Sequence, residues 1–244
     1  MSKLYLVPTP VGNLKDITAR ALEVLRLVSL VLAEDTRKSG LLLKHYGIKV
    51  PMRAYHAFNE HRSSEGICDL IEGGRETALV TNAGTPGISD PGFFLVRMCV
   101  ARGIDIESLP GPTAFVPALT LSGIPCDRFC FEGFLPHKKG KRAKIEALSN
   151  EQRTMVFYES PHRIVKTLDM MSEYFGEERE ASVSREITKI HEETVRGTLA
   201  SLLKHFTDNP PKGELALVVA GHSGKRDKEQ PASDCDLPET GKNS

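Results

Sequence analysis

Short apolar runs alternate with amphipathic stretches along most of the chain, and this alternation restricts the possible folds more than any other feature. In the first half, strand-length apolar runs lie at 4–7, 29–33, 52–55, 77–81 and 104–109. The stretches between them have apolar residues at helical spacing, at 16–27, 36–46, 63–72 and 93–102. Strands that alternate with helices need crossover connections. We therefore predict an α/β fold with a mostly parallel sheet.

The sequence Pro110-Gly111-Pro112 interrupts this rhythm, which starts again after a helix predicted at 113–122. Further strands are predicted at 129–134, 154–158, 181–185, 193–196 and 215–220. Further helices are predicted at 141–148, 161–175 and 199–206, the second with Ser160 as its cap and Pro161 as its first residue. This pattern predicts two α/β domains, at 1–114 and 115–221. The polar tail at 222–244 has one Leu and is expected to be disordered.

Composition excludes several classes of protein. The 244 residues suit one large or two modest domains, and a formal net charge of 0 excludes a uniformly basic nucleic-acid coat. The five cysteines form no CxxC and are odd in number, which favours a reducing, cytoplasmic location. The chain has no apolar run of the roughly 20 residues that span a bilayer and no secretory signal, so we expect no membrane association.

Three loops rich in Gly, Pro and small hydroxyl residues follow predicted strands, at 8–14, 82–92 and 110–114. Ligands bind at the carboxyl ends of the strands of an open parallel sheet. Such loops hold backbone groups close to a ligand. Any one of them could be only a tight connection, but three at one sheet edge favour a small-molecule site.

Familiar catalytic motifs are absent from the sequence. There is no GxGxxG after a strand, no GxxxxGK[ST], no GxSxG and no HExxH. Cys126 and Cys130 have no nearby partner residues of the kind a zinc site needs. We therefore expect no metal.

A basic segment at 138–144 opens one predicted helix. Its five cations are Lys138, Lys139, Lys141, Arg142 and Lys144, with no acid among them. Cations at a helix N-terminus oppose the helix dipole. A bound polyanion would offset that cost, and Phe134 nearby suits stacking on RNA bases. The alternative is a solvated helix start.

Four carboxylates follow predicted strands: Glu34, Asp35, Glu159 and Glu186. Of these, Glu34, Asp35 and Glu159 are candidates for a general base. Each also has a cation nearby, so a structural ion pair is the alternative for each. The sequence does not choose among them.

Several motifs together resemble a known family. They are Thr9-Pro10-Val11-Gly12-Asn13-Leu14, Ala33-Glu34-Asp35-Thr36-Arg37, 83–92 (AGTPGISDPG), 110–114 (PGPTA), 131–136 (FEGFLP), 158–163 (YESPHR), 185–189 (REITK) and 212–214 (KGE). Their combination and order resemble the tetrapyrrole-methylase superfamily, and within it the bacterial enzymes that methylate small-subunit ribosomal RNA. The resemblance runs from about residue 4 to 221.

This resemblance implies a homodimeric enzyme that uses S-adenosylmethionine to methylate the ribose 2′-oxygen of a cytidine in the decoding region of 16S rRNA, within the small ribosomal subunit. It implies two αβα domains with the cofactor in the cleft between them. The cofactor-binding residues would be Pro8, Pro10, Gly12, Ala83, Gly84, Thr85, Pro86, Ile88, Ser89, Thr113 and Ala114. On the charge argument above, we expect the RNA-binding residues to be the five cations of the basic segment, together with Arg163. Asn82 stands where the family usually has Asp.

Two other functions stay open. The chain could be a small-molecule methylase acting on a tetrapyrrole, although such a pocket has no evident use for the basic segment. It could also be an RNA-binding assembly factor without catalytic activity, against which the three cofactor-type loops argue.

Overall fold

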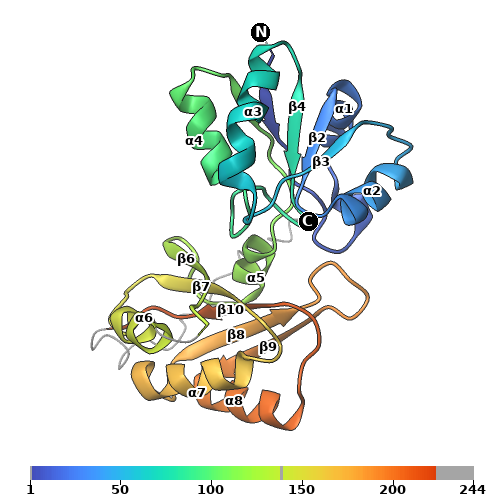
Figure 1. Ribbon diagram of the computed structural model, residues 1–244. Coiled ribbons are helices and arrows are strands. Elements are labelled where there is room, and N and C mark those ends of the chain that lie inside the picture. Colours follow the sequence, from blue (N-terminus) through green and yellow to red (C-terminus); the bar gives the residue numbers. More distant parts are fainter. Residues whose placement is uncertain (1, 138–139, 224–244) are drawn as a thin grey trace, which may run out of the picture.

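A computed structural model describes residues 2–137 and 140–223 and contains two five-stranded sheets (Figure 1). The N-terminal sheet has the order β3-β2-β4-β1-β5, and all of its strands are parallel. Its strands are β1 (Leu4–Leu6), β2 (Leu30–Ala33), β3 (Met52–Ala54), β4 (Thr77–Val80) and β5 (Ile106–Ser108). Its helices are α1 (Ala19–Leu27), α2 (Thr36–His45), α3 (Glu60–Glu72) and α4 (Phe93–Ala101).

Both faces of the N-terminal sheet are buried. Helices α1 and α2 pack on one face through a cluster that includes Leu25 and Leu43. Helices α3 and α4 pack on the other face through Ile67 and Leu95. Because both faces are covered, all residues of a strand such as Leu30–Ala33 are buried. This burial explains why the sequences of these strands are continuous apolar runs.

The C-terminal sheet has the order β6-β7-β10-β8-β9. Its strands are β6 (Phe129–Phe134), β7 (Thr154–Glu159), β8 (Glu180–Arg185), β9 (Glu193–Thr198) and β10 (Leu215–Val219). Strands β6 and β7 are parallel and the other pairs are antiparallel, so the sheet is mixed. The sequence-based prediction of an α/β fold with mostly parallel or mixed sheets is therefore confirmed.

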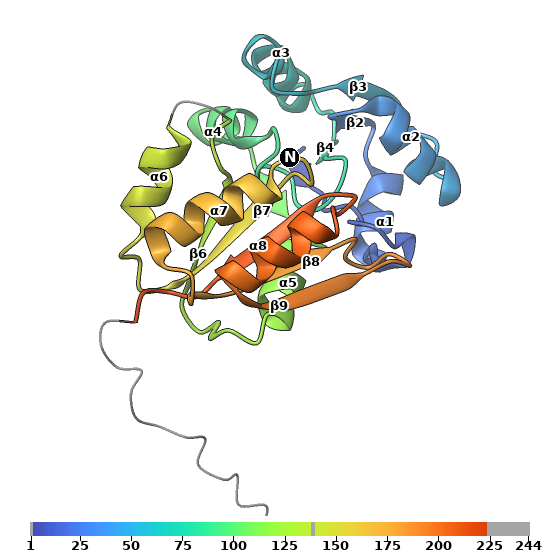
Figure 2. The same ribbon diagram turned by 90° about the horizontal axis from the view of Figure 1, so that it is seen from below.

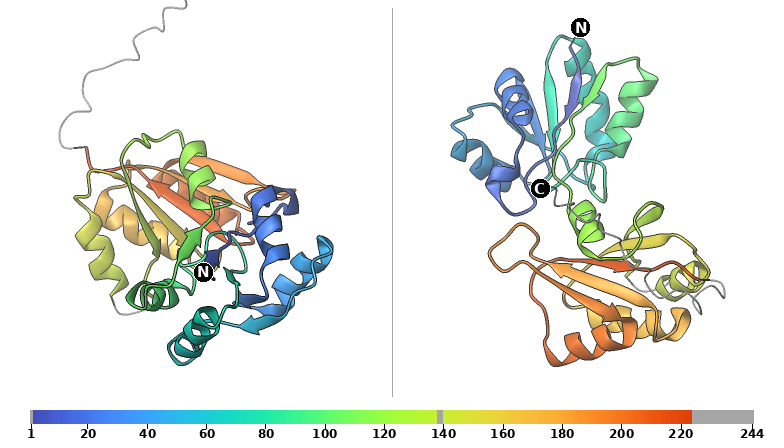
Figure 3. Two further views of the ribbon diagram at one scale, coloured as in Figure 1. Left: turned by 90° about the horizontal axis from the view of Figure 1, so that it is seen from above. Right: turned by 180° about the vertical axis from the view of Figure 1, so that it is seen from behind.

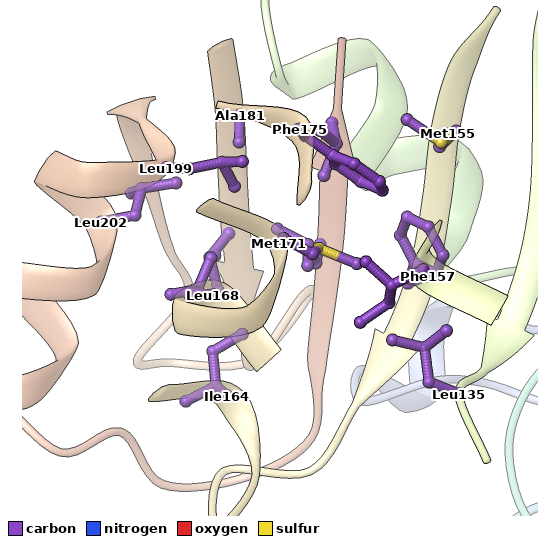
Figure 4. Close-up of a cluster of buried hydrophobic side chains, with 14 of the residues drawn as sticks. Leu135, Met155, Phe157, Ile164, Leu168, Met171, Phe175, Ala181, Leu199 and Leu202 are labelled. Atoms are coloured by element: carbon purple, nitrogen blue, oxygen red, sulfur yellow. The ribbon is translucent and has the colours of Figure 1, made fainter. Parts of the chain in front are cut away.

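Helices cover both faces of this sheet as well. Helices α6 (Lys141–Leu148), α7 (Ile164–Phe175) and α8 (Leu199–Asp208) share one core with the sheet. Figure 4 shows Met171 of α7 beside Phe157 of β7 in that core. Helix α5 (Phe115–Leu121) covers the opposite face and packs against β10. Figure 2 shows α7 and α8 together on one side of the sheet, with α5 on the other.

The two sheets are joined through residues 109–114, which lead into α5. The domain limits 1–114 and 115–221 stay a prediction. Of the tail predicted to be disordered, residues 224–244 lie outside the described part of the chain. Within that part, no helix has the length and apolar character needed to cross a membrane.

The helix predicted to begin at Pro161 begins instead at Ile164. The reason is local. The Ser160 hydroxyl accepts the N–H of His162 at 3.3 Å, and the N–H of Arg163 bonds to the carbonyl of Ser160 at 3.0 Å, so a turn closes before the helix starts. Helix α1 likewise begins at Ala19 rather than Asp16, because Thr18 caps it by accepting the N–H of Ala21.

Candidate functional site

A pocket of about 290 Å³ lies between the loops of the N-terminal sheet and the C-terminal half. Seven of the residues predicted to bind cofactor line it: Ala83, Gly84, Thr85, Ile88, Ser89, Thr113 and Ala114. A second pocket of about 250 Å³ adjoins it and shares Val11, Lys38, Asn82 and Ala83 with it. The predicted residues Pro10 and Gly12 line this second pocket. Pro8 and Pro86 line neither pocket and are buried behind these loops.

Direct contacts join the three Gly/Pro loops to one another. Thr9 and Gly84 form an isolated bridge in which each N–H donates to the other's carbonyl at 2.9 Å. The Thr85 hydroxyl donates to the carbonyl of Pro112 at 3.3 Å. Pro8 lies so close to Gly111 that a Cβ there would come within 2.6 Å of it. The prediction that these loops gather at one sheet edge is therefore confirmed.

Backbone strain is concentrated around the larger pocket. Among the described residues other than glycine, only Ser89, Glu186 and Thr188 have positive φ, at 61°, 51° and 65°. Ser89 and Glu186 line the pocket, and Thr188 follows two residues later. Such conformations cost free energy and cluster at functional sites, because the surrounding structure must hold them.

Glu34 lines the larger pocket, as its prediction as a base requires. Its Oε2 accepts from the Asn82 side-chain nitrogen at 2.7 Å and from the Thr81 hydroxyl at 3.2 Å. Asn82 therefore acts as a donor to a carboxylate. Its own Oδ1 is buried without a hydrogen-bond partner among the described residues, which leaves an acceptor free for a ligand N–H.

Asp35 has a structural role. It caps α2 by accepting the N–H of Arg37 at 2.9 Å and also pairs with the Arg37 guanidinium at 2.9 Å. The hydrogen bond from the Arg37 side chain, with that from its backbone, lowers the pKa of Asp35 to about 2. Asp35 lines neither pocket. These contacts favour the alternative of an ion pair that braces the loop.

Glu159 does not have the accessible position that a base needs. Its side chain is buried and lies 3.2 Å from Arg163 Nε and 3.6 Å from Lys141 Nζ. The Thr167 hydroxyl donates at 2.6 Å to Oε2, the same carboxylate oxygen that faces Lys141. The sequence analysis missed this burial because it depends on how α6, which carries Lys141, and α7, which carries Thr167, pack over the end of β7.

Lys141 was predicted to bind RNA, and its position contradicts that prediction. Only 6% of the residue is exposed, and burial lowers the pKa of its ammonium group. The physical reason is that α6 turns this side chain inward toward Glu159. The cost of opposing the helix dipole is thus offset by a buried carboxylate rather than by a bound polyanion.

The remaining predicted RNA contacts differ in exposure. Arg142 pairs with Glu173 at 2.8 Å and Lys144 with Glu132 at 2.6 Å, and both cations keep exposed side chains. The Arg163 guanidinium is mostly buried and donates to the carbonyl of Leu135 at 2.8 Å, so it holds the segment before α6. Lys138 and Lys139 lie outside the described residues.

The sequence analysis noted Glu186 as a carboxylate after a strand, and it does line the larger pocket. Two other carboxylates of the lining, Asp90 and Glu214, were not among its candidates. Burial raises the pKa of Asp90 to about 6, assisted by the negative charges of Glu34 and Glu214. Asp90 escaped notice because it lies within a long Gly/Pro loop and does not directly follow a strand. A count of carboxylates within the predicted ligand loops would have found it. In the described ranges, no cluster of His, Cys, Asp and Glu could hold a metal ion.

Comparisons with known proteins identify the class. A family model described as tetrapyrrole (corrin/porphyrin) methylases matches residues 3–203. The fold is similar to that of the methyltransferase CobJ, with a TM-score of 0.69 at 17% identity over 91% of this chain and 95% of that chain. It is also similar to a uroporphyrin-III C-methyltransferase from Thermus thermophilus, with a TM-score of 0.64 at 22% identity over 90% and 94%. The chain belongs to the tetrapyrrole methylase family.

Relatives with curated names indicate one group of proteins within this family. A protein from Haemophilus influenzae is 50% identical over 221 residues, which are 89% of this chain and 78% of that protein. One from Thermotoga maritima is 44% identical over 221 residues, which are 91% of this chain and 99% of that protein. Both are named ribosomal RNA small subunit methyltransferase I. The resemblance noted from the sequence motifs is thereby confirmed.

Proposed function

We propose that this protein is an S-adenosylmethionine-dependent methyltransferase of small-subunit ribosomal RNA, which methylates the ribose 2′-oxygen of a cytidine in the decoding region of 16S rRNA. The observation that carries this proposal is the 44–50% identity, over about nine tenths of the chain, to relatives named for methylation of that RNA. Seven of the residues that the family resemblance assigns to the cofactor line the larger pocket, which supports the proposal.

The pocket residues suit S-adenosylmethionine. When bound, this cofactor supplies an electrophilic methyl group on a positively charged sulfur. The pocket is lined by four carboxylates, Glu34, Asp90, Glu186 and Glu214, and by two lysines, Lys38 and Lys189, so its formal charge is of the opposite sign. The buried, unpartnered Oδ1 of Asn82 offers an acceptor for an amino or amide N–H of the ligand. The pocket volume is at the lower limit for small-molecule sites, and the adjoining pocket extends it.

Asp90 and Glu34 take different parts in handling the proton of the ribose hydroxyl. A base works best with a pKa near the operating pH, and burial brings the pKa of Asp90 to about 6. Oε2 of Glu34 already accepts two side-chain hydrogen bonds, so it is suited to orient the hydroxyl. We therefore assign proton acceptance to Asp90 and orientation to Glu34.

The RNA would contact the C-terminal half through the basic segment. Arg142 and Lys144 remain available there with exposed side chains, and Lys138 and Lys139 complete the predicted basic segment. The small ribosomal subunit as the substrate, the homodimer and the cytoplasmic location stay predictions. Phe93 and Val100, seven residues apart on α4 and both about two thirds exposed, form an apolar stripe that dimerisation would cover.

The test uses purified protein, S-adenosylmethionine with a labelled methyl group, and three acceptors: small ribosomal subunits from cells lacking this gene, naked 16S rRNA, and uroporphyrinogen. Digestion to nucleosides followed by mass spectrometry should place the label in 2′-O-methylcytidine. Label on a base, or only on the tetrapyrrole, would contradict the proposal. RNA binding without any transfer of label would indicate an assembly factor.

A further inference from the structure

The loop between β8 and β9 crosses from the C-terminal half to the N-terminal half. This loop, residues 186–192, is called the strap. Figure 3 shows it, in the right-hand view, projecting from the C-terminal sheet toward the loops of the N-terminal sheet. Glu186, Ile187 and Lys189 of the strap line the larger pocket, so the strap forms one of its walls.

The strap rests against Gly12 at a distance that only glycine permits. A Cβ at position 12 would lie 2.8 Å from the carbonyl oxygen of Ile187, 2.8 Å from Thr188 Oγ1 and 2.6 Å from Lys189 Cγ. One of these atoms is backbone, so the strap would have to move to accommodate any side chain. The neighbouring N–H of Asn13 donates to the Thr188 hydroxyl at 3.0 Å.

Contacts within the strap maintain its strained shape. The Lys189 ammonium pairs with the Glu186 carboxylate at 2.9 Å, and the N–H of Thr188 donates to Glu192 at 2.6 Å. Ile187 is buried against α5 and β10. Glu186 and Thr188 both have positive φ, a conformation that needs support from its surroundings.

A second close approach lies at another wall of the pocket. Gly133, at an irregularity in β6, faces Ser89 of the N-terminal half, and a Cβ there would come within 3.0 Å of the Ser89 hydroxyl. Ser89 is the third residue with positive φ. The three described residues other than glycine that have positive φ therefore lie beside the pocket. They lie at the two places where a glycine of one half contacts the other half.

We propose that the strap is a positioning element, and that its docking on Gly12 and Asn13 holds the two halves at the separation that makes the pocket fit its ligand. Gly12 and Thr188 are then positioning residues, because they affect ligand binding through the shape of the pocket. That this ligand is S-adenosylmethionine rests on the proposed function. The docking of the strap on Gly12 and Asn13 does not rest on it. Removing the contact should loosen the strap and weaken ligand binding together.

The experiment compares Gly12→Ala with Gly66→Ala, whose added methyl group meets no atom within 4 Å. Hydrogen exchange of the full chain without ligand reports strap docking, because local opening exposes amides. Titration calorimetry with S-adenosylmethionine reports binding. We expect Gly12→Ala to speed exchange in peptides covering 186–192 and to weaken binding by about tenfold or more. Gly66→Ala should alter neither.

Thr188→Val and Thr188→Ser form a second pair that does not depend on Gly12→Ala folding. Valine keeps the branched shape but removes the acceptor of the Asn13 N–H, whereas serine keeps the hydroxyl. We expect about threefold to fivefold weaker binding for Thr188→Val, corresponding to one hydrogen bond, and rescue by Thr188→Ser.

The results separate the two proposals. Unchanged strap exchange in Gly12→Ala, or faster exchange with unchanged affinity, would overturn the positioning role. If the wild-type protein does not bind S-adenosylmethionine, the proposed function fails, and the exchange comparison alone then decides whether Gly12 docks the strap.

Discussion

Glu34 and Glu159 occupy equivalent places in their two sheets, each at the carboxyl end of a buried strand, but their surroundings differ. Glu34 follows β2, lines the larger pocket and has neutral partners, Thr81 and Asn82. Glu159 ends β7, is buried, and lies between the cations of Lys141 and Arg163. One sheet edge is therefore open to a ligand, and the other is closed by an ion-pair network.

The contrast shows that a carboxylate directly after a strand in the sequence predicts where the side chain lies in the fold, but not what it does there. At the N-terminal edge, Gly/Pro loops keep side chains away and leave space. At the C-terminal edge, α6 and α7 bring Lys141 and Thr167 onto the carboxylate. The charge at the open edge is available for chemistry, whereas the charge at the closed edge supports folding and holds the segment before α6.

The largest expected effect of this contrast is on the rate of methyl transfer. Asp90→Asn should slow single-turnover methyl transfer by about 10²–10⁴-fold at saturating substrates, because the proton acceptor is lost. Asp35→Asn is the matched control, since Asp35 caps α2 outside the pockets, and its rate should stay within a few-fold of the wild type. A normal rate for Asp90→Asn would move the role of base to Glu34.

Stability should show the opposite pattern. Glu159→Gln leaves the ammonium of Lys141 and the guanidinium of Arg163 without their carboxylate, so the free energy of unfolding should fall by about 3 kcal/mol. Glu34→Gln removes a charge that has neutral partners and should cost less than about 1 kcal/mol. Denaturant unfolding measures both. Equal losses would mean that the two edges do not differ as described.

Ligand affinity should depend on the open edge alone. Gly84 has φ of +83° in the loop that lines the pocket, so Gly84→Val should displace that loop and weaken S-adenosylmethionine binding by about tenfold to hundredfold. Gly103→Val is the control, because Gly103 has φ of +68° and lies at the end of α4 away from both pockets. Equal loss of binding in the two folded variants would place the cofactor elsewhere.

The pH dependence of stability gives a smaller effect at the open edge. The pKa of Asp90 rises from 3.8 to about 6 on folding, so the folded state holds an extra proton between these values. Ionised Asp90 therefore destabilises the fold above about pH 6. Asp90→Asn should raise the free energy of unfolding at pH 7 by about 1–2 kcal/mol, allowing for partial exposure, and the gain should vanish below about pH 4. A gain that is constant with pH would contradict this origin.

The smallest expected effect concerns RNA. Neutralising Arg142 and Lys144 together should reduce the salt dependence of RNA binding by about 0.7 in slope for each phosphate of single-stranded RNA that these cations would otherwise neutralise. Arg102, paired with Asp69 and Glu72 on the N-terminal half, supplies the control substitution Arg102→Gln. An unchanged slope in the double variant would remove these cations from the RNA interface.

Sequence patterns were sufficient where the deciding interactions are local. Thr36 to His45 ends as predicted near Gly47, and Phe129–Phe134 and Lys141–Leu148 match their predicted bounds, because periodicity and capping depend on neighbours in the chain. The same reasoning failed at Ser160, where a capping hydroxyl serves a turn rather than a helix.

By itself, the sequence determined the α/β class, the three ligand loops and the family, since short-range spacing and motif order carry that information. Only the tertiary structure decided which charges are accessible. Burial of Glu159 and Lys141, exposure of Glu34 to the pocket, the raised pKa of Asp90 and the docking of the strap on Gly12 all depend on contacts between residues far apart in the chain. Electrostatic free energy depends on what surrounds a charge in space, and the packing of helices against each sheet sets those surroundings.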